Sequence, residues 1–406
     1  MTQIFDKKLG LIIFFGIILR LISIYYFADT KIDNEWDIML YNLEHNKILS
    51  VRSIDGVAVP NIFMPPLYPL FLYLVKSLIV DAEFFLNTIF IIQLFFSLIS
   101  IILIYKKFLK IFDSNLSYIG TIIFTIFPLN VFAVAQVSSI ILQMLLINFF
   151  LFSFVSLIKK IKYKYIYLFS LSSALLILLR GEFFIFVIFS LFFLFLMKKE
   201  VKSLLLTAML VLLLVSPYLY RNYNLFGVIT ITKSSGYNLL KGNHPRTVVG
   251  GIGMFNEVEN VIPEVKQELE ELYKKGPIKN HDLLKDKILL NQALSFIKDN
   301  PTKYAELYLK KFFSFAFIDF NSSYPNYYSL YHLLPKILLS ISSIIGLILI
   351  INFGINISNY FALFYLGNLG LFSFFFILPR YSLSLLTVQI ILSLFGVGKL
   401  LNKSKL

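Results

Sequence analysis

The stretch LGLIIFFGIILRLISIYYFA, residues 9–28, contains 20 residues and one charged side chain, Arg20. This length is about what a helix needs to cross the hydrocarbon core of a bilayer. Lys7 and Lys8 precede the run, and no cleavage site of small residues follows it. We therefore expect an uncleaved membrane anchor rather than a signal peptide.

Further apolar runs recur along the whole chain. The composition agrees with this pattern, because 58% of the 406 residues are hydrophobic and 15% are charged, whereas soluble domains have about 45–50% and ~25%. The runs are continuously apolar rather than alternating, which excludes a membrane β-barrel. The sequence predicts an all-α polytopic membrane protein with about 10 transmembrane helices. After 9–28, these occupy 84–105, 117–136, 139–158, 165–179, 183–197, 203–219, 335–353, 359–378 and 381–398.

Lysine clusters between the runs predict the topology. They lie at 106–110, 159–164, 198–202 and 399–405, and basic loops stay on the cytoplasmic side. All four clusters fall inside only if the short run Leu67–Val80, which follows Pro65 and Pro66, does not cross the membrane. We assign it as an interfacial or re-entrant helix on the outer face. Both termini are then inside.

This topology leaves two large exterior segments, at about 29–83 and 220–334. The chain accordingly divides into 1–219, with the first exterior segment, then 220–334, and then the C-terminal helices of 335–406. The second exterior segment has helical patterns from Pro263 to Gly276, from Asp282 to Asp299, and from Pro301 into an interfacial-looking stretch at 312–317. We expect interfacial helices in both exterior segments.

Cysteine is absent and the four histidines are scattered. This excludes disulfides, thiolate catalysis and Cys-based metal centres, and no histidine metal motif is present. We predict no metal site. The formal net charge is +14, but the basic residues follow membrane topology, so we predict membrane lipids and not nucleic acid as partners.

Arginine is used differently from lysine. The chain has 31 lysines and six arginines, and five of the six arginines fall on the predicted exterior. Arginine offers a planar fork that holds phosphate oxygens through two hydrogen bonds. Arg180, Arg221 and Arg380 come from three helix ends at one membrane face, which favours a convergent anion site. Snorkelling of single arginines to the interface is the alternative.

Acidic residues concentrate at the same face. Asp33 and Asp37 would share one side of a helix over 34–44, with Trp36 beside them. Like charges at this spacing cost a few tenths of a kcal/mol, so arginines, a metal ion or water must compensate for them. A carboxylate near a bound phosphate ester would suit group transfer to a hydroxyl or amine. A solvated acidic loop is the alternative.

Six motifs in this order resemble the polytopic GT-C glycosyltransferases, specifically the bacterial relatives of protein O-mannosyltransferases and of lipid A aminoarabinose transferase, glycosyltransferase family 39 and its neighbours. The resemblance covers nearly the whole chain. The motifs are Asp33-Asn34-Glu35-Trp36, Pro65 to Leu70, Leu179-Arg180-Gly181-Glu182, Ser216 to Gly227, the pair Gly236 to Leu239 with Gly242 to Pro245, and Pro379-Arg380-Tyr381.

The resemblance implies transfer of a sugar from a polyprenyl-phosphate donor to a glycan, lipid or protein acceptor at the outer face of a bacterial inner membrane, with 1–219 as the catalytic module. It implies that Asp33, or as second choice Glu35, is the catalytic carboxylate. It also implies that Arg180, Arg221 and Arg380 bind the donor phosphate. Residues 236–245 would cover the sugar. The implied substrate contacts are Trp36, Asp37, Tyr68, Glu182, Asn222, Asn243, His244 and Tyr381.

One departure from the family keeps alternatives open. Many relatives carry a second acid at the start of the fourth span, whereas Gln136 to Gln143 contain none. No cofactor is predicted, and the family leaves a divalent metal open. A catalytically silent partner in cell-envelope assembly is one alternative function. A transporter or flippase of lipid-linked sugars is the other, although it should place ionisable groups near mid-membrane, where Arg20 is the main example.

Overall fold

The computed structural model describes residues 6–32, 35–79, 81–251, 263–319, 329–351 and 354–401. It is nearly all helical, as predicted. The elements are α1 Lys7–Phe27, α2 Glu35–His45, β1 Ser53–Ile54, β2 Val57–Ala58, α3 Leu67–Leu78, α4 Ala82–Ile111, α5 Ser114–Ile126, α6 Pro128–Phe132, η1 Ala133–Ala135, α7 Ile140–Lys159, α8 Tyr163–Leu179, α9 Phe183–Lys198, α10 Val201–Phe226, α11 Ser235–Gly242, α13 Pro263–Tyr273, α14 His281–Asp299, α15 Pro301–Ala316, α16 Leu330–Ile350, α17 Ile357–Ser373, η3 Pro379–Leu385 and α18 Leu386–Leu400.

Polar side chains fix several helix boundaries. Asp113 accepts a hydrogen bond from the Leu116 backbone N–H at 2.8 Å and starts α5. Asn356 accepts a hydrogen bond from the Asn359 backbone N–H at 2.9 Å and starts α17. These caps satisfy N–H groups that the first helical turn leaves unpaired. Gly227 ends α10 at φ +72, a conformation that glycine adopts without steric cost.

Each of the ten predicted apolar runs contains a helix in the described residues, but the predicted number of spans is not confirmed. Within the described residues, six helices are long and apolar enough to cross a membrane, namely α1, α4, α7, α10, α16 and η3 joined to α18. The bent pair α5 and α6–η1 raises the number to seven. Helices α8 and α9, with 17 and 16 residues, fall below the length of a full span.

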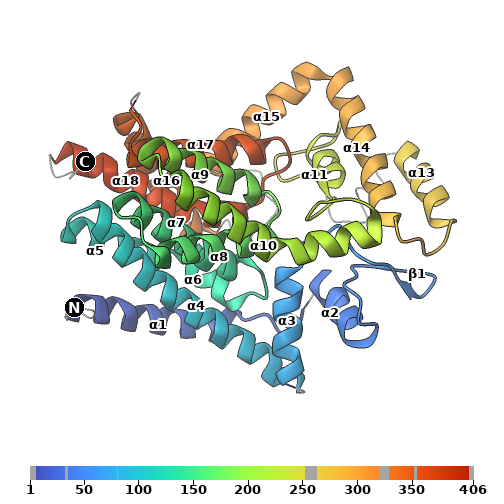
Figure 1. Ribbon diagram of the computed structural model, residues 1–406, viewed down its shortest axis with the longest axis horizontal. Helices are drawn as coiled ribbons and strands as arrows, with labels where there is room; N and C mark the ends of the chain where they lie inside the picture. Colours follow the sequence, from blue (N-terminus) through green and yellow to red (C-terminus); the bar gives the residue numbers. More distant parts are fainter. Residues whose placement is uncertain are drawn as a thin grey trace.

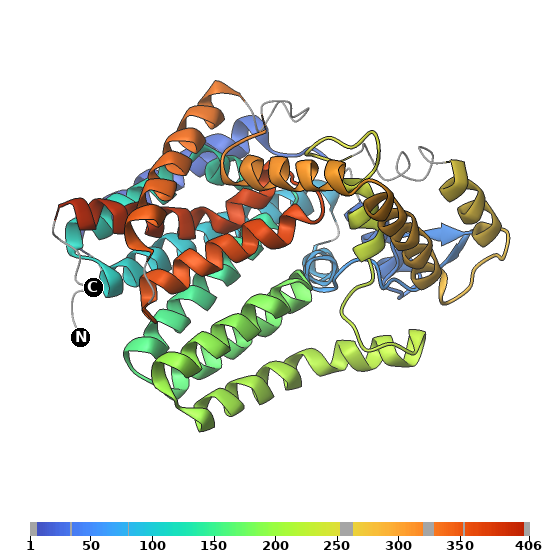
Figure 2. The same cartoon turned by 90° about the horizontal axis from the view of Figure 1, so that it is seen from above.

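The helices form a bundle with α7 and the η3–α18 unit at its centre. In the most apolar 18-residue stretch of each, 83% of the residues are buried, against 22% in α1 and 17% in α10. Helix α7 packs against α4 and α8, and α18 packs against α16. Helix α10 runs along one side of the bundle and packs mainly on α8 (Figure 2).

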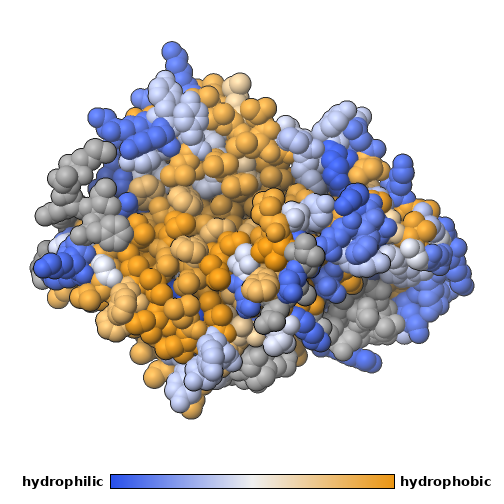
Figure 3. Space-filling model, turned by 90° about the horizontal axis from the view of Figure 1, so that it is seen from below, coloured by the Kyte–Doolittle hydropathy of each residue, from blue (hydrophilic) through white to orange (hydrophobic). Residues whose placement is uncertain are grey.

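The long axis of the molecule separates the chain ends from the exterior segments. Both ends of the chain lie at one end of this axis, and α11, α13, α14 and β1 lie at the other (Figure 1). A broad hydrophobic surface lies between two hydrophilic ends (Figure 3). This arrangement fits a bundle whose middle part lies in a bilayer.

Helix α3 differs in direction from the bundle. It stands upright in the first view, in which α1 is nearly horizontal, and is seen end-on in the second view (Figures 1 and 2). Its 12 residues are too few to cross a bilayer. Tyr68, Leu72 and Val75 form its buried side, and Leu70, Leu74 and Leu78 are exposed. An amphipathic helix across the bundle direction is the geometry expected for the interfacial assignment of this segment.

Two cations within spanning helices are buried inside the bundle. Arg20 of α1 donates to Ser97 Oγ at 2.7 Å and to the Thr125 carbonyl at 3.1 Å. Lys107 of α4 lies in a basic cluster that the sequence assigns to the cytoplasmic loops, but its side chain is fully buried and donates to Asn148 Oδ1 at 3.3 Å. The helix face that carries Lys107 is turned toward α7, whereas Lys106 is exposed.

The two exterior segments pack together. A β-hairpin with Asp55 and Gly56 at its turn, both with positive φ, belongs to the first. Helices α13, α14 and α15 of the second begin at Pro263, His281 and Pro301, close to the predicted starts. Arg52 of the first segment and Asp282 of the second form an ion pair of 3.2 Å between Nε and Oδ1.

Candidate functional site

The first exterior segment contains an aromatic contact next in sequence to the predicted catalytic residues. Asp33 and Asn34 lie outside the described residues. Glu35 opens α2 and is half-buried, and Asp37 is exposed. Trp36 is buried against Tyr68 of α3, with 5.0 Å between the ring centroids. The two predicted substrate contacts Trp36 and Tyr68 are therefore neighbours, and the contact fixes α2 on α3.

Asp29 joins this cluster, although the motif comparison did not select it. Its Oδ2 accepts a hydrogen bond from the Val137 backbone N–H at 2.7 Å, and its own N–H donates to the Ala135 carbonyl at 3.0 Å. Burial raises the pKa of Asp29 above its ordinary value, and the Val137 hydrogen bond opposes this. Asp29 thus places a carboxylate at the start of Gln136 to Gln143, the segment without an acid. The sequence signal for it is that Asp29 is the first acid after the first apolar run.

Among the described residues, the buried hydroxyl of Tyr68 has no hydrogen-bond partner. Burial raises the pKa of Tyr68, and the negative charge of Asp29 raises it further. The Tyr68 phenol therefore stays protonated and can donate a hydrogen bond. Tyr68 belongs to the first turn of α3, and its ring packs against that of Trp36.

The predicted phosphate ligand Arg180 lies near Tyr381, the neighbour of Arg380 in the chain. Arg180 follows the last residue of α8, and its guanidinium carbon lies 5.7 Å from the centroid of the Tyr381 ring. Arg380 precedes Tyr381 in η3 and is exposed. In the described part of the chain, neither side chain has a hydrogen bond or ion pair. Their donors are available to an anion, and Glu182 is half-buried two residues after Arg180.

Arg221 is held by the protein itself. It donates to the Asn61 carbonyl at 2.9 Å and to Asn222 Oδ1 at 2.7 Å, and its guanidinium lies over the Tyr218 ring. Asn222 is fully buried and donates to the Thr230 carbonyl at 2.7 Å. Both residues connect α10 to the exterior segments. The predicted convergence of Arg221 with Arg180 and Arg380 stays a prediction.

The end of α8, with Arg180, and the end of α10, with Arg221, are nevertheless linked through residues 230–232. A Cβ atom on Gly181 would lie 3.1 Å from Thr232 Oγ1. The turn after Arg180 therefore packs directly on the segment 230–232. Asn222 binds the Thr230 and Ile231 carbonyls from the other side. The ends of α8 and α10 are therefore joined by one short segment.

The predicted cover over the sugar, residues 236–245, is anchored at both ends. The Gly236 backbone N–H donates to Asp286 Oδ1 of α14 at 2.7 Å. A Cβ on Gly236 would lie 2.1 Å from the Asp286 carbonyl oxygen, and one on Gly242 would lie 2.0 Å from that of Phe375. Both positions require glycine because backbone approaches so closely. Burial raises the pKa of Asp286, and the Gly236 hydrogen bond opposes this.

Asn243 and His244 lie in the last part of this cover. The buried Asn243 amide donates to the Leu239 and Phe374 carbonyls, and its oxygen accepts from Lys311 Nζ at 3.0 Å. Burial lowers the pKa of Lys311 to about 7. Burial and the nearby Arg246 lower the pKa of His244, so its imidazole is neutral near pH 7. Asn243 acts as a structural link, whereas a neutral imidazole at His244 can accept or donate one hydrogen bond.

A metal centre does not emerge from the described residues, in which no three His, Asp or Glu side chains form a group that could hold an ion. Asp33 is not among the described residues.

Comparisons with known proteins identify the fold of the chain. No protein-family model matches the chain, and no curated protein sequence matches it. The chain is similar to the crystal structure of the oligosaccharyltransferase of the archaeon Archaeoglobus fulgidus tethered with an acceptor peptide, with a TM-score of 0.57 and 14% identity over 98% of this chain and 49% of that chain. It is also similar to the same archaeon's oligosaccharyltransferase AglB in complex with an inhibitory peptide and a dolichol-phosphate, with a TM-score of 0.55 and 13% identity over 98% and 50%.

The chain has a GT-C-like fold. This confirms the fold that the sequence motifs predict, while the placement in family 39 stays a prediction. The chain spans about half the length of these solved structures. At this level of identity the similarity establishes the fold alone.

Proposed function

We propose that this GT-C-like chain is a membrane glycosyltransferase that moves a sugar from a polyprenyl-phosphate carrier to a glycan, lipid or protein acceptor. The observation that carries the proposal is the pair Arg180 and Arg380 beside Tyr381, with guanidinium donors that no described side chain or carbonyl occupies. Arginine is the side chain best suited to hold phosphate oxygens at a membrane interface.

The similar structures support a lipid-phosphate donor. The archaeal oligosaccharyltransferase AglB was solved with a dolichol-phosphate, and its counterpart with a tethered acceptor peptide. By analogy, this chain would accept a lipid-linked phosphate from the bilayer and an acceptor from the exterior side. We place the reaction at the outer face of a bacterial inner membrane.

The proposed step assigns one role to each group. The acceptor oxygen or nitrogen attacks the anomeric carbon, the bond from that carbon to the carrier phosphate oxygen breaks, and the carrier phosphate leaves with the electron pair. Arg180 and Arg380 stabilise the charge that develops on the phosphate. Asp33 takes the acceptor's proton, with Glu35 as the alternative base. Tyr68 and His244 offer single hydrogen bonds to the sugar or the acceptor.

Replacement of Asp33 by Asn tests the enzyme against the transporter alternative. We expect transfer to fall by about 10²–10⁴-fold, the usual contribution of general acid–base catalysis, while donor binding is retained. Mass spectrometry of cell-envelope glycans and glycoproteins, in cells with and without the gene, identifies the product for this assay. Asp299→Asn is the matched control, because Asp299 is an exposed acid of the second exterior segment with no predicted role in the site. Unchanged turnover in Asp33→Asn would remove Asp33 from the mechanism.

A further inference from the structure

Lys311 is a fully buried lysine of α15, next to the exposed Lys310. Its ammonium donates to the Gly242 carbonyl at 2.6 Å and to Asn243 Oδ1 at 3.0 Å. Among the described residues, no carboxylate lies within ion-pair distance of it. Burial of an ammonium among neutral partners is costly. An apolar side chain of equal length would avoid this cost, so the two hydrogen bonds are what the lysine adds at this position.

The ammonium of Lys311 fixes the orientation of the Asn243 side-chain amide. An ammonium can only donate hydrogen bonds, whereas an amide has an oxygen that accepts and a nitrogen that donates. The amide oxygen accepts from Lys311, and the amide nitrogen donates to the Leu239 and Phe374 carbonyls, each at 2.8 Å. A flipped amide would place a donor against the ammonium and an oxygen against both carbonyls. Lys311 therefore excludes the flipped orientation and secures the hydrogen bond to Phe374.

Residues 374–378 lead from α17 to η3, and hydrogen bonds hold both ends of this segment. Near its start, the Phe374 carbonyl accepts from the Asn243 amide. Near its end, the Ile377 backbone N–H donates to the Val249 carbonyl at 3.0 Å. Because η3 begins directly after the segment, the placement of the segment sets the placement of Arg380.

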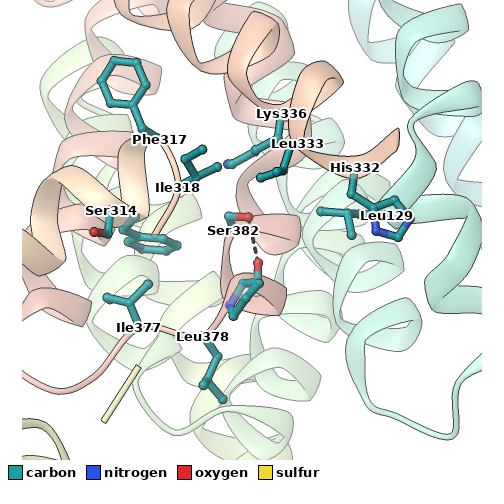
Figure 4. A pocket seen from close by; sticks show the side chains of 12 residues that line it. Leu129, Ser314, Phe317, Ile318, His332, Leu333, Lys336, Ile377, Leu378 and Ser382 are labelled. Atoms are coloured by element: carbon teal, nitrogen blue, oxygen red, sulfur yellow. Dashed lines mark hydrogen bonds between the residues drawn. The ribbon is translucent and has the colours of Figure 1, made fainter. Parts of the chain in front are cut away.

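The end of α15 leaves a pocket beside this segment (Figure 4). The pocket holds about 350 Å³ of empty space, counted to its open side. Its lining includes Ser314 and Phe317 from the end of α15 and Ile377 and Leu378 from the segment. Because side chains do not fill this space, packing against the end of α15 does not fix the segment on its own. The hydrogen bonds described above are therefore needed to hold it in place.

We propose that Lys311 is a positioning residue for the transfer reaction. By fixing the Asn243 amide, it holds residues 374–378, and with them Arg380 and Tyr381 of η3, in the arrangement that binds the donor phosphate. The inference rests on the proposed function, in which Arg380 is a phosphate ligand. It deepens that function, because one lysine then sets both the cover over the sugar and the ligand of the phosphate. Lys311 acts through Asn243 and needs no contact with either substrate.

Hydrogen exchange of the full-length protein in detergent, followed by mass spectrometry, tests this link without a transfer assay. Lys311→Met keeps the length of the side chain and removes the ammonium. We expect peptides that cover residues 374–385 to exchange about tenfold faster, as the loss of a hydrogen bond to a charged group predicts. Lys303→Met is the matched control, because Lys303 of α15 also donates to the cover, at the Pro245 carbonyl, but its side chain is exposed.

Transfer kinetics separate positioning from a general loss of stability. We expect kcat/KM for the lipid-linked donor to fall by about tenfold in Lys311→Met, while KM for the acceptor changes by less than about twofold, since Arg380 serves the donor. Asn243→Leu should produce the same change. The double variant should be no worse than either single variant, because both residues act through one hydrogen bond.

Unchanged exchange of residues 374–385 in Lys311→Met would overturn the proposal, as would faster exchange with a donor kcat/KM equal to that of wild type. If Lys311→Met fails to fold, Lys311→Gln takes its place. Glutamine can donate or accept, so it no longer fixes the Asn243 amide and should raise exchange in the same peptides. Faster exchange in these variants of a protein that transfers no sugar as wild type would support the hold on η3 and reject the proposed function.

Discussion

Two arginine regions at the same end of the molecule have opposite surroundings. Arg52 and Arg221, with Asp282 and Asn61, form what we call the exterior clamp, in which protein atoms bind the guanidinium groups. Arg180 and Arg380 stand beside Tyr381 without a polar partner in the described residues. Position in the sequence does not distinguish these arginines. Their hydrogen-bond partners do, and they separate arginines that stabilise the fold from arginines available to a ligand.

Asp282→Ala tests the clamp and should have the largest effect. Arg52 and Asp282 are 12% and 2% exposed, and Asp282 also accepts the Ile62 backbone N–H at 3.1 Å. Removing one partner of a buried ion pair costs about 3–5 kcal/mol. We expect the free energy of unfolding of the exterior part to fall by that amount. Fluorescence of Trp36, the single tryptophan of the chain, reports it during chemical unfolding in detergent.

The control for this measurement is Glu306→Ala. Glu306 forms an exposed pair with Lys310 one helical turn away, and such pairs contribute a few tenths of a kcal/mol. A loss in Asp282→Ala no larger than in Glu306→Ala would show that the clamp does not hold the exterior segments.

Arg180→Ala tests the other side of the comparison. We expect transfer to fall by about 100-fold, in the range reported for removal of one donor that stabilises a developing charge, with little change in the unfolding transition. Quantitative glycan mass spectrometry measures transfer, and Trp36 fluorescence follows the unfolding transition. Arg246→Ala serves as control, because Arg246 is exposed in the second exterior segment. A variant that loses stability but keeps transfer would move Arg180 into the class of Arg221.

The sequence predicted the architecture better than the roles of single residues. Hydrophobic runs and lysine clusters predicted helical spans and the non-spanning α3, because both follow from the bilayer. Motifs selected both Arg180 and Tyr381, which are neighbours in the structure, although their predicted roles stay predictions. They could not separate Arg221 from Arg180, since that difference depends on the Asn61 carbonyl, 160 positions away. They also missed Lys311, which in sequence is one more lysine beside Lys310.

Gly242→Ala probes the backbone between the two regions. A Cβ there would lie 2.0 Å from the Phe375 carbonyl oxygen, in the segment that leads to η3. Overpacking of this kind costs about 1–3 kcal/mol, and displacement of η3 should lower transfer as well as stability. Gly10→Ala is the control, since nothing lies within 4 Å of the added atom. Unchanged transfer and stability in Gly242→Ala would mean that this contact transmits nothing to the arginine pair.

His281 has no effect near neutral pH and links the clamp to acid pH. It is fully buried beside Asp282, and its ring centroid lies 5.0 Å from that of Tyr273. Burial, with Arg52 and Lys285 nearby, lowers the pKa of His281 to about 4, and Asp282 opposes this shift. The folded protein therefore keeps His281 neutral where the unfolded chain, with a pKa near 6.5, takes up a proton.

Stability from this group is complete above about pH 6.5 and is lost as the pH falls toward 4. The free energy of unfolding changes through this group by at most about 1.4 kcal/mol per pH unit. His281→Phe keeps an aromatic ring against Tyr273 and should remove this slope, whereas His45→Gln, at an exposed position, should leave it. If unfolding free energies of wild type and His281→Phe run parallel from pH 7 to pH 4, the clamp is insensitive to protons and its strength rests on the Arg52–Asp282 pair alone.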